Sequence, residues 1–383
     1  MVGSRSALLL LFVAAASVTD AAPTVVASEA IDEEPECYAP RWNAEHKNTG
    51  TNAALGRLFR RFVDSGRVPA DTVVLHGRVD VHDATPVGNR WDPDTADLGL
   101  FRGLLGKKPT LRWQNQSYIV EALRRRGCFE VAPWPLSVAN QLCIGQQHGA
   151  TAALVASSRR RTAFWPGDTN YRYIFHGLSS SEGDALRAMI LRDLPMDSLA
   201  ATFGVDFIRG TGSRRPGRNT FFLGSRGTNS VLHVHTAAIN ALVVGGPKVW
   251  ITAPESSKDA VARFSFGRVT NQSVSDWLLT HLDFLLDNVP GLAIFVQREG
   301  DVVFLPHFQF HATVNLGYNV GASFAFFEKN CNGNGHCMDR WEDVLQIQSD
   351  SMDECFEARV CRKPERCMCR PAWEFPWEDP DPH

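Results

Sequence analysis

The sequence has 383 residues, of which 44% are hydrophobic and 21% are charged, and its formal net charge at pH 7 is −3. This length and composition are typical of a globular protein with one or two domains rather than of a disordered or fibrous chain. A charge so close to zero gives no overall field that would attract nucleic acid, so we expect no nucleic-acid partner.

The N-terminus has the features of a secretory signal peptide. Arg5 provides a positive start, residues 8–18 are apolar, and small residues lead up to Ala22. The apolar run is shorter than the roughly 20 residues that span a bilayer. We therefore predict a signal peptide over residues 1–22, no membrane span after its removal, and a protein of the ER or Golgi lumen or a secreted protein.

Residues 23–71 are expected to form a linker and a helix. Apolar residues at Leu55, Leu58, Phe59 and Phe62 follow a helical period. A strand is expected at residues 72–77, and residues 80–166 give only a weak pattern. Residues 171–175 predict a further strand, and residues 180–191 and 276–286 predict helices. Residues 240–244 and 248–252 predict two strands joined by a glycine turn.

Two histidines define a candidate metal site. Residues 230–235 are apolar and β-branched enough to predict a strand, on which His233 and His235 share one face. Two imidazoles on one face need a third ligand, and His311 follows a second strand-like run, residues 301–306. The alternative is that these histidines are polar residues that line a barrel interior.

The surrounding residues resemble the Jumonji C (JmjC) family of Fe(II)- and 2-oxoglutarate-dependent oxygenases. The family has His-x-Asp/Glu followed by Pro-x-x-x-x-His, and here His311 lies 78 residues after His233 and five after Pro306. The lead-in Phe221-Phe222-Leu223-Gly224 and the run Gly246-Pro247-Lys248-Val249-Trp250 also look like family motifs. The resemblance implies a mainly β domain with flanking helices over residues 72–327, built as a double-stranded β-helix, a jelly-roll or cupin-like barrel.

The resemblance also implies roles for particular residues. His233, His235 and His311 would hold Fe(II), and Ser230 and Lys248 would bind 2-oxoglutarate, since Lys248 lies 15 residues after His233. Asn240 and Asn315 resemble polar residues that line the family's cofactor pocket, and hydrogen bonding within the core is the alternative for both. The implied activity is hydroxylation of a protein or a glycan in the secretory pathway.

One departure from the family leaves other functions open. His235 stands where the family has a carboxylate ligand. The domain could be a catalytically inactive, JmjC-like lumenal binding or scaffold protein, or another cupin-type enzyme that uses three histidines without 2-oxoglutarate. A shifted register that begins a His-x-Ala motif at His235, as in halogenating relatives, fits the positions of Ser230 and Lys248 less well. The sequence predicts neither the substrate nor the oligomeric state.

Residues 328–383 form a Cys-rich tail. Six of the nine cysteines lie there, at positions 331, 337, 355, 361, 367 and 369. In a secreted chain this clustering predicts disulfide bonds, and six cysteines allow 15 pairings. A zinc site that uses Cys367 and Cys369 is the alternative.

We expect the tail cysteines of the mature protein to be mostly oxidised, because the predicted signal peptide sends them to an oxidising compartment. Mass mapping of the secreted protein without reduction, after thiol alkylation, would measure this. Alkylation throughout the tail, or one bound zinc per chain, would contradict the disulfide prediction.

Overall fold

The computed structural model describes residues 50–83, 97–126, 129–133, 140–142, 148–160, 172–178, 184–205, 216–228, 233–262, 282–283 and 285–326, all of which lie in one compact unit. The predicted signal peptide, the first part of the predicted linker, Ser230 and the Cys-rich tail lie outside these ranges. Within them, no helix is both long enough and apolar enough to cross a membrane.

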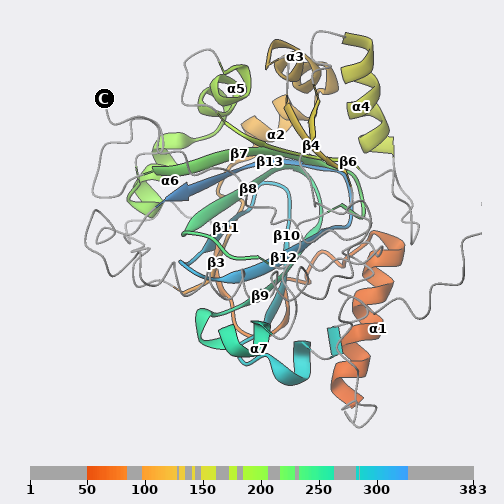
Figure 1. Cartoon of the computed structure of the whole chain (residues 1–383), viewed down its shortest axis with the longest axis vertical. Coiled ribbons are helices and arrows are strands. Elements are labelled where there is room, and N and C mark those ends of the chain that lie inside the picture. Colours follow the sequence, from red (N-terminus) through yellow and green to blue (C-terminus); the bar gives the residue numbers. More distant parts are fainter. Residues whose placement is uncertain are drawn as a thin grey trace, which may run out of the picture. The chain divides into compact units, whose positions relative to one another are not determined.

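The described residues form short helices and many strands (Figure 1). The helices are α1 (Gly50–Ser65), α2 (Lys107–Trp113), α3 (Gln116–Arg126), α4 (His148–Arg160), α5 (Ala185–Asp193), α6 (Met196–Phe203), the 3-10 turn η1 (Glu255–Ser257) and α7 (Lys258–Ala262). The strands are β1 (Val74–His76), β2 (Asp80–Asp83), β3 (Gly99–Arg102), β4 (Phe129–Pro133), β5 (Asn140–Leu142), β6 (Arg172–Gly177), β7 (Pro216–Gly224), β8 (Ala238–Gly245), β9 (Lys248–Ala253), β10 (Ala293–Gln297), β11 (Val302–Leu305), β12 (Phe310–Asn315) and β13 (Asn319–Phe326).

The strands make two sheets. The smaller has the order β1-β10-β9-β12, and the larger has the order β2-β3-β11-β8-β13-β7-β6-β4-β5. All neighbours are antiparallel except β2 and β3. Two mixed-order antiparallel sheets with long connections are the arrangement of a jelly-roll or cupin-like barrel. The predicted fold class is confirmed, and the tail lies outside the described part.

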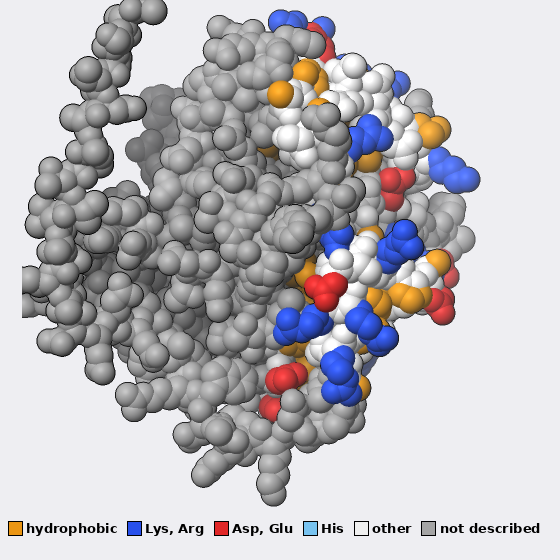
Figure 2. All heavy atoms as spheres, turned by 90° about the vertical axis from the view of Figure 1, so that its right-hand side faces the viewer, with side chains coloured by type: hydrophobic (Ala, Val, Ile, Leu, Met, Phe, Trp, Pro, Cys, Tyr) orange, Lys and Arg blue, Asp and Glu red, His pale blue; other side chains and the backbone are white. Residues whose placement is uncertain are grey.

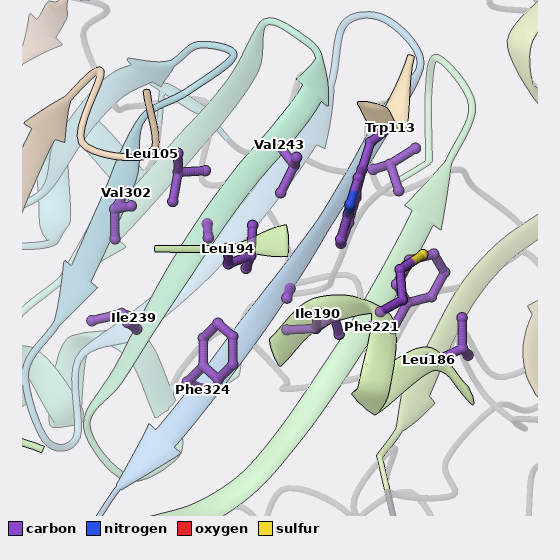
Figure 3. Close-up of a cluster of buried hydrophobic side chains, with 14 of the residues drawn as sticks. Leu105, Trp113, Leu186, Ile190, Leu194, Phe221, Ile239, Val243, Val302 and Phe324 are labelled. Atoms are coloured by element: carbon purple, nitrogen blue, oxygen red, sulfur yellow. The ribbon is translucent and has the colours of Figure 1, made fainter. Parts of the chain in front are cut away.

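Helices cover the outer face of the larger sheet. Alternate residues of β7, β8, β11 and β13 form one apolar cluster with residues of α2, α3, α5 and α6, and Figure 3 shows side chains from both layers, including Trp113, Ile190, Phe221 and Phe324. Burial of each such large side chain contributes roughly 1.5–3 kcal/mol. The outer face therefore supplies much of the stability, and the inner face can carry polar residues.

The predicted N-terminal helix is present and packs on the smaller sheet. Phe59 and Phe62 of α1 are buried against alternate residues of β9, β10 and β12. Arg226 donates hydrogen bonds to the carbonyl groups of Val63 and Asp64, so it satisfies the C-terminal end of α1. The opposite face of α1 is mainly basic, with Arg57, Arg60 and Arg61 exposed, and Figure 2 shows Lys and Arg side chains gathered on this side of the molecule.

Two helix predictions differ from the structure at their ends. The helix predicted at 180–191 begins at Ala185, because the Asp184 side chain accepts hydrogen bonds from the backbone N–H groups of Leu186 and Arg187 and caps it there. Residues 282–283 and 285–288 are helical, and the rest of the helix predicted at 276–286 lies outside the described residues.

The turn between β8 and β9 depends on glycine. Gly245 has φ of 88°, and a Cβ atom there would lie 1.7 Å from the Tyr318 carbonyl oxygen. We expect Gly245→Ala to lower the free energy of unfolding by at least about 2 kcal/mol. The left-handed backbone costs alanine roughly 1–2 kcal/mol, and the clash of its Cβ atom with the Tyr318 carbonyl adds to that cost. Urea unfolding would measure the loss.

Gly103 provides a matched control. It has φ of 64°, and a Cβ atom there would meet nothing within 4 Å. Gly103→Ala should therefore show only the conformational cost of about 1 kcal/mol. Equal losses in the two variants would mean that the contact with Tyr318 does not limit the turn.

Candidate metal centre

A reciprocal backbone contact joins the two segments that carry the histidines. His233 N–H donates to the His311 carbonyl at 3.0 Å, and His311 N–H donates to the His233 carbonyl at 2.8 Å. Phe308 N–H donates to the His235 carbonyl at 3.2 Å. These three bonds hold residues 233–235 against the start of β12.

The strand predicted at 230–235 is wrong for its described part. Among residues 233–235, pairing is limited to an isolated bridge between His233 and His311. The ladder stops because the partner chain turns at Phe308, whose φ is 57°. Residues 230–232 lie outside the described part.

The bridge brings three imidazole rings together. The ring centroids of His233 and His311 are 4.1 Å apart, those of His235 and His311 4.6 Å, and those of His233 and His235 5.4 Å. One possible ligand atom from each histidine lies within 4.8 Å of those of the other two. Small shifts of the rings would allow all three nitrogens to bind one ion at the usual distance of about 2.0–2.1 Å.

Backbone carbonyls fix the protonation of two of these rings. His235 Nδ1 lies 2.6 Å from the Thr236 carbonyl oxygen, and His311 Nδ1 lies 2.8 Å from the Gln309 carbonyl oxygen. A carbonyl can only accept, so each Nδ1 carries the proton and each Nε2 keeps its lone pair. Neutral imidazoles oriented in this way are suited to a divalent transition metal.

Burial keeps these histidines neutral. The pKa of His235 is lowered by burial, although the bond to Thr236 opposes the shift. The pKa of His311 is well below its ordinary value because of burial and then because of the neighbouring His233 and His235. Metal can therefore bind near neutral pH without first displacing protons from these two rings.

Lys248 is a buried lysine on the inner face of β9. The side chain is 1% exposed, and its ammonium group lies 4.0 Å from the centre of the Phe222 ring and 5.4 Å from that of Trp250. Burial lowers its pKa to about 7. No acidic side chain among the described residues forms an ion pair with it, so an anionic ligand would be a favourable partner.

The Trp250 ring lies near both the His311 ring and the Lys248 ammonium group. Its ring centroid is 5.8 Å from that of His311, and its Nε1 donates to Gln297 Oε1 at 2.8 Å. Gln297 Nε2 in turn donates to the Asn240 carbonyl at 2.8 Å, which links the two sheets. This network fixes the indole beside the histidines.

The two predicted asparagines differ. The Asn315 amide donates to Thr228 Oγ1 at 2.9 Å and accepts from Asn319 Nδ2 at 2.6 Å, so hydrogen bonding within the core engages both of its ends. Asn240 Oδ1 is buried and has no hydrogen-bond partner among the described residues. Asn240 therefore remains a candidate ligand contact, and Ser230 lies outside the described part.

Two further interior residues were not predicted. Tyr173 of β6 packs with Phe222 and Leu242 beneath the Lys248 ammonium group. Thr252 pairs with His311 across neighbouring strands, and its buried hydroxyl group has no hydrogen-bond partner among the described residues. Counting every second residue from Lys248 would have placed Thr252 on the inner face.

Comparison with known proteins finds a family match in the region that contains the three histidines. Residues 221–326 match the family model described as "JmjC domain, hydroxylase". The match spans β7 to β13 and contains all three histidines and Lys248. No curated protein matches the chain.

The buried histidines predict a pH-dependent stability in the metal-free protein. The pKa of His311 is lower in the folded protein than in the unfolded chain, so acid protonates the unfolded chain first. The free energy of unfolding should therefore fall as the pH drops below the unfolded pKa of about 6.5. His311→Gln should lose less unfolding free energy than the wild type when the pH is lowered from about 8 to about 5.5. Thermal unfolding of both proteins tests this, and equal losses would contradict it.

Proposed function

Residues 221–326 belong to the JmjC family, and on that premise we propose that the protein is an Fe(II)- and 2-oxoglutarate-dependent oxygenase of the secretory pathway. Its substrate class would be a protein side chain or a glycan. The observation that carries the proposal is the presence, in one interior, of three convergent imidazoles and a buried lysine without an acidic partner among the described residues.

The residues fit the metal and the cofactor in complementary ways. His233, His235 and His311 would hold Fe(II), and Lys248 would pair with the far carboxylate of 2-oxoglutarate. The metal and cofactor together supply the oxidising chemistry that inserts oxygen into a C–H bond. The protein binds and orients them, fixes the imidazoles through backbone carbonyls, and keeps water away, since His311 and Lys248 are 3% and 1% exposed.

Ser230 and Asn240 would complete the cofactor contacts. The unpartnered Asn240 Oδ1 supports a ligand contact at that position. The cofactor contact of Ser230 is proposed from the sequence alone. Asn315 would act indirectly, because its amide joins β12 to Thr228 and Asn319.

The secretory location rests on the N-terminal sequence. A leader with Arg5 and an apolar run at residues 8–18 would direct the chain to the lumen or outside the cell. Lumenal substrates are proteins and glycans, which is why we propose these classes. N-terminal sequencing of the secreted protein should find a start near Ala22, and a mature protein that begins at Met1 would overturn the location.

The alternative function is a catalytically inactive, JmjC-like lumenal binding or scaffold protein. It is favoured by one observation, the lack of a carboxylate in the described metal-ligand cluster. Without that carboxylate, iron binding loses one favourable charge. A three-histidine enzyme independent of 2-oxoglutarate is less well supported, because Lys248 would then be a buried cation with no ligand to pair with.

Succinate formation separates these functions. We expect the wild type with Fe(II) to convert 2-oxoglutarate to succinate, and Lys248→Ala to reduce the rate by at least about 30-fold, because loss of one partner of a buried charge pair costs roughly 2–5 kcal/mol. His235→Asp should preserve or raise turnover, since it supplies a carboxylate ligand.

Lys258→Ala, at the first residue of α7, is the control and should behave like the wild type, because Lys258 is not among the candidate metal ligands. Turnover that survives Lys248→Ala would overturn the cofactor assignment. No turnover in the wild type together with no bound metal would favour the scaffold function.

A further inference from the structure

Helix α1 carries a row of arginine side chains on its exposed face. Arg57, Arg60 and Arg61 are exposed, and their spacing of three and four residues places them on one side of the helix. Asp64 is exposed on the same side and is the only acidic residue of α1. Figure 2 shows Lys and Arg side chains gathered on this side of the molecule. Three arginines against one aspartate give the row a net positive charge.

The arginines of α1 differ from those of a second arginine-rich helix, α3. Among the described residues, no side chain forms an ion pair or a hydrogen bond with the three guanidinium groups of α1. On α3, by contrast, Arg124 and Arg125 lie 2.7 and 2.8 Å from the carboxylate of Glu121. The charge of α3 is therefore partly balanced within the helix, whereas the charge of α1 is available to a ligand.

The exposed face of α1 offers charge without apolar surface. The large exposed hydrophobic side chains of the described residues are Val74, Val81 and Leu111, and none of them lies on α1. Phe59 and Phe62, on its apolar side, are buried against the smaller sheet. A helix that lies in a membrane surface needs an exposed apolar face, and protein interfaces usually centre on apolar and aromatic residues. The surface is therefore suited to a ligand that is held by charge alone.

We propose that the exposed face of α1 binds a sulfated polysaccharide. A planar guanidinium group binds oxyanions through paired hydrogen bonds, and a linear polyanion presents such groups at regular intervals. Successive turns of a helix are about 5.4 Å apart, so Arg57 and Arg61 can bind neighbouring charged groups of one polysaccharide chain. Polysaccharides of this kind occur in the lumen and outside the cell, where the proposed secretory route would deliver the protein.

The packing of α1 supports binding at this face. Phe59 and Phe62 hold the helix on the smaller sheet, and Arg226 donates hydrogen bonds to the carbonyl groups of Val63 and Asp64 at its end. A backbone that is already fixed loses less entropy on binding than a mobile segment does. The helix contributes no residue to the candidate metal centre. The inference therefore uses the proposed location but does not depend on the proposed chemistry.

The test is binding of the full-length protein to heparin, a sulfated polysaccharide, measured by isothermal titration calorimetry at several salt concentrations. Counterion release makes the logarithm of the affinity fall linearly with the logarithm of the salt concentration, with a slope of roughly one per charged contact. Polyglutamate represents an acidic peptide, and vesicles of phosphatidylcholine and phosphatidylserine in equal parts represent an anionic membrane. Thermal unfolding checks that each protein is folded.

Adjacent arginines on the two helices give a matched comparison. Replacing Arg60 and Arg61 together with Gln should weaken heparin binding about fivefold at low salt and reduce the salt slope by about two. Replacing Arg124 and Arg125 with Gln removes the same charge from α3, and the affinity should change by less than about twofold, because Glu121 already pairs with both. Asp64→Asn should strengthen binding about twofold, since it removes the only acidic side chain of α1.

Several results would overturn the inference. Equal losses from the two arginine pairs would mean that heparin is attracted to the whole molecule rather than to α1. The folded wild type might fail to bind heparin at physiological salt, which would end the inference directly. Tighter binding of polyglutamate or of the vesicles than of heparin would assign the surface to an acidic peptide or to a membrane instead.

The chain's own acidic residues provide one more occupant to test. Asp32, Glu33 and Glu34 precede α1 in the sequence. If heparin binds only after these three are replaced with Asn, Gln and Gln, the acidic segment occupies the face of α1 and the inference is wrong. Each of these failures would leave the proposed oxygenase function untouched, because α1 contributes none of the candidate metal ligands.

Discussion

The candidate site depends on the reciprocal backbone hydrogen bonds between His233 and His311. They join two segments that lie 78 residues apart in the sequence, at N···O distances of 3.0 and 2.8 Å. Each such bond contributes only about 1 kcal/mol to stability. Their importance is geometric, because they set the separation of the two rings to 4.1 Å and leave the neighbouring His235 to complete the cluster.

Strand β9 shows how the fold accommodates a polar interior. Val249, Ile251 and Ala253 face the apolar cluster that α1 covers. Lys248, Trp250 and Thr252 alternate with them and face inward. Burying a lysine without an ion pair costs free energy, and the outer clusters on both sheets offset that cost. The three histidines and the lysine can therefore lie in the interior without loss of the fold.

Which side chains of β9 and β12 face the interior could be predicted from the sequence, because successive side chains of a strand point to opposite faces of the sheet. The same rule failed at residues 233–235, where the left-handed turn at Phe308 ends the pairing, and no local pattern shows that turn. The region between residues 80 and 166 contains short helices whose apolar faces are defined by the sheet that they cover. Their pattern is therefore weak in the sequence alone.

The hydrogen bonds of Asn315 show a different limit. Its residue type and its place on a predicted strand suit a ligand contact and a core amide equally well. Two hydrogen bonds decide between these roles: Thr228, in the turn after β7, and Asn319, the first residue of β13, engage both ends of the Asn315 amide. Sequence spacing cannot reveal that a side chain's hydrogen-bonding capacity is already used by residues on other strands.

Lys248 is the strongest argument against a purely structural role for the interior. A scaffold needs no buried ammonium group, and an apolar side chain of similar size would pack against Phe222 and Trp250 at lower cost. The candidate ligand cluster of the described residues contains three imidazoles and no carboxylate. A buried lysine near three imidazoles, with no acidic partner among the described residues, favours an anionic occupant of this interior.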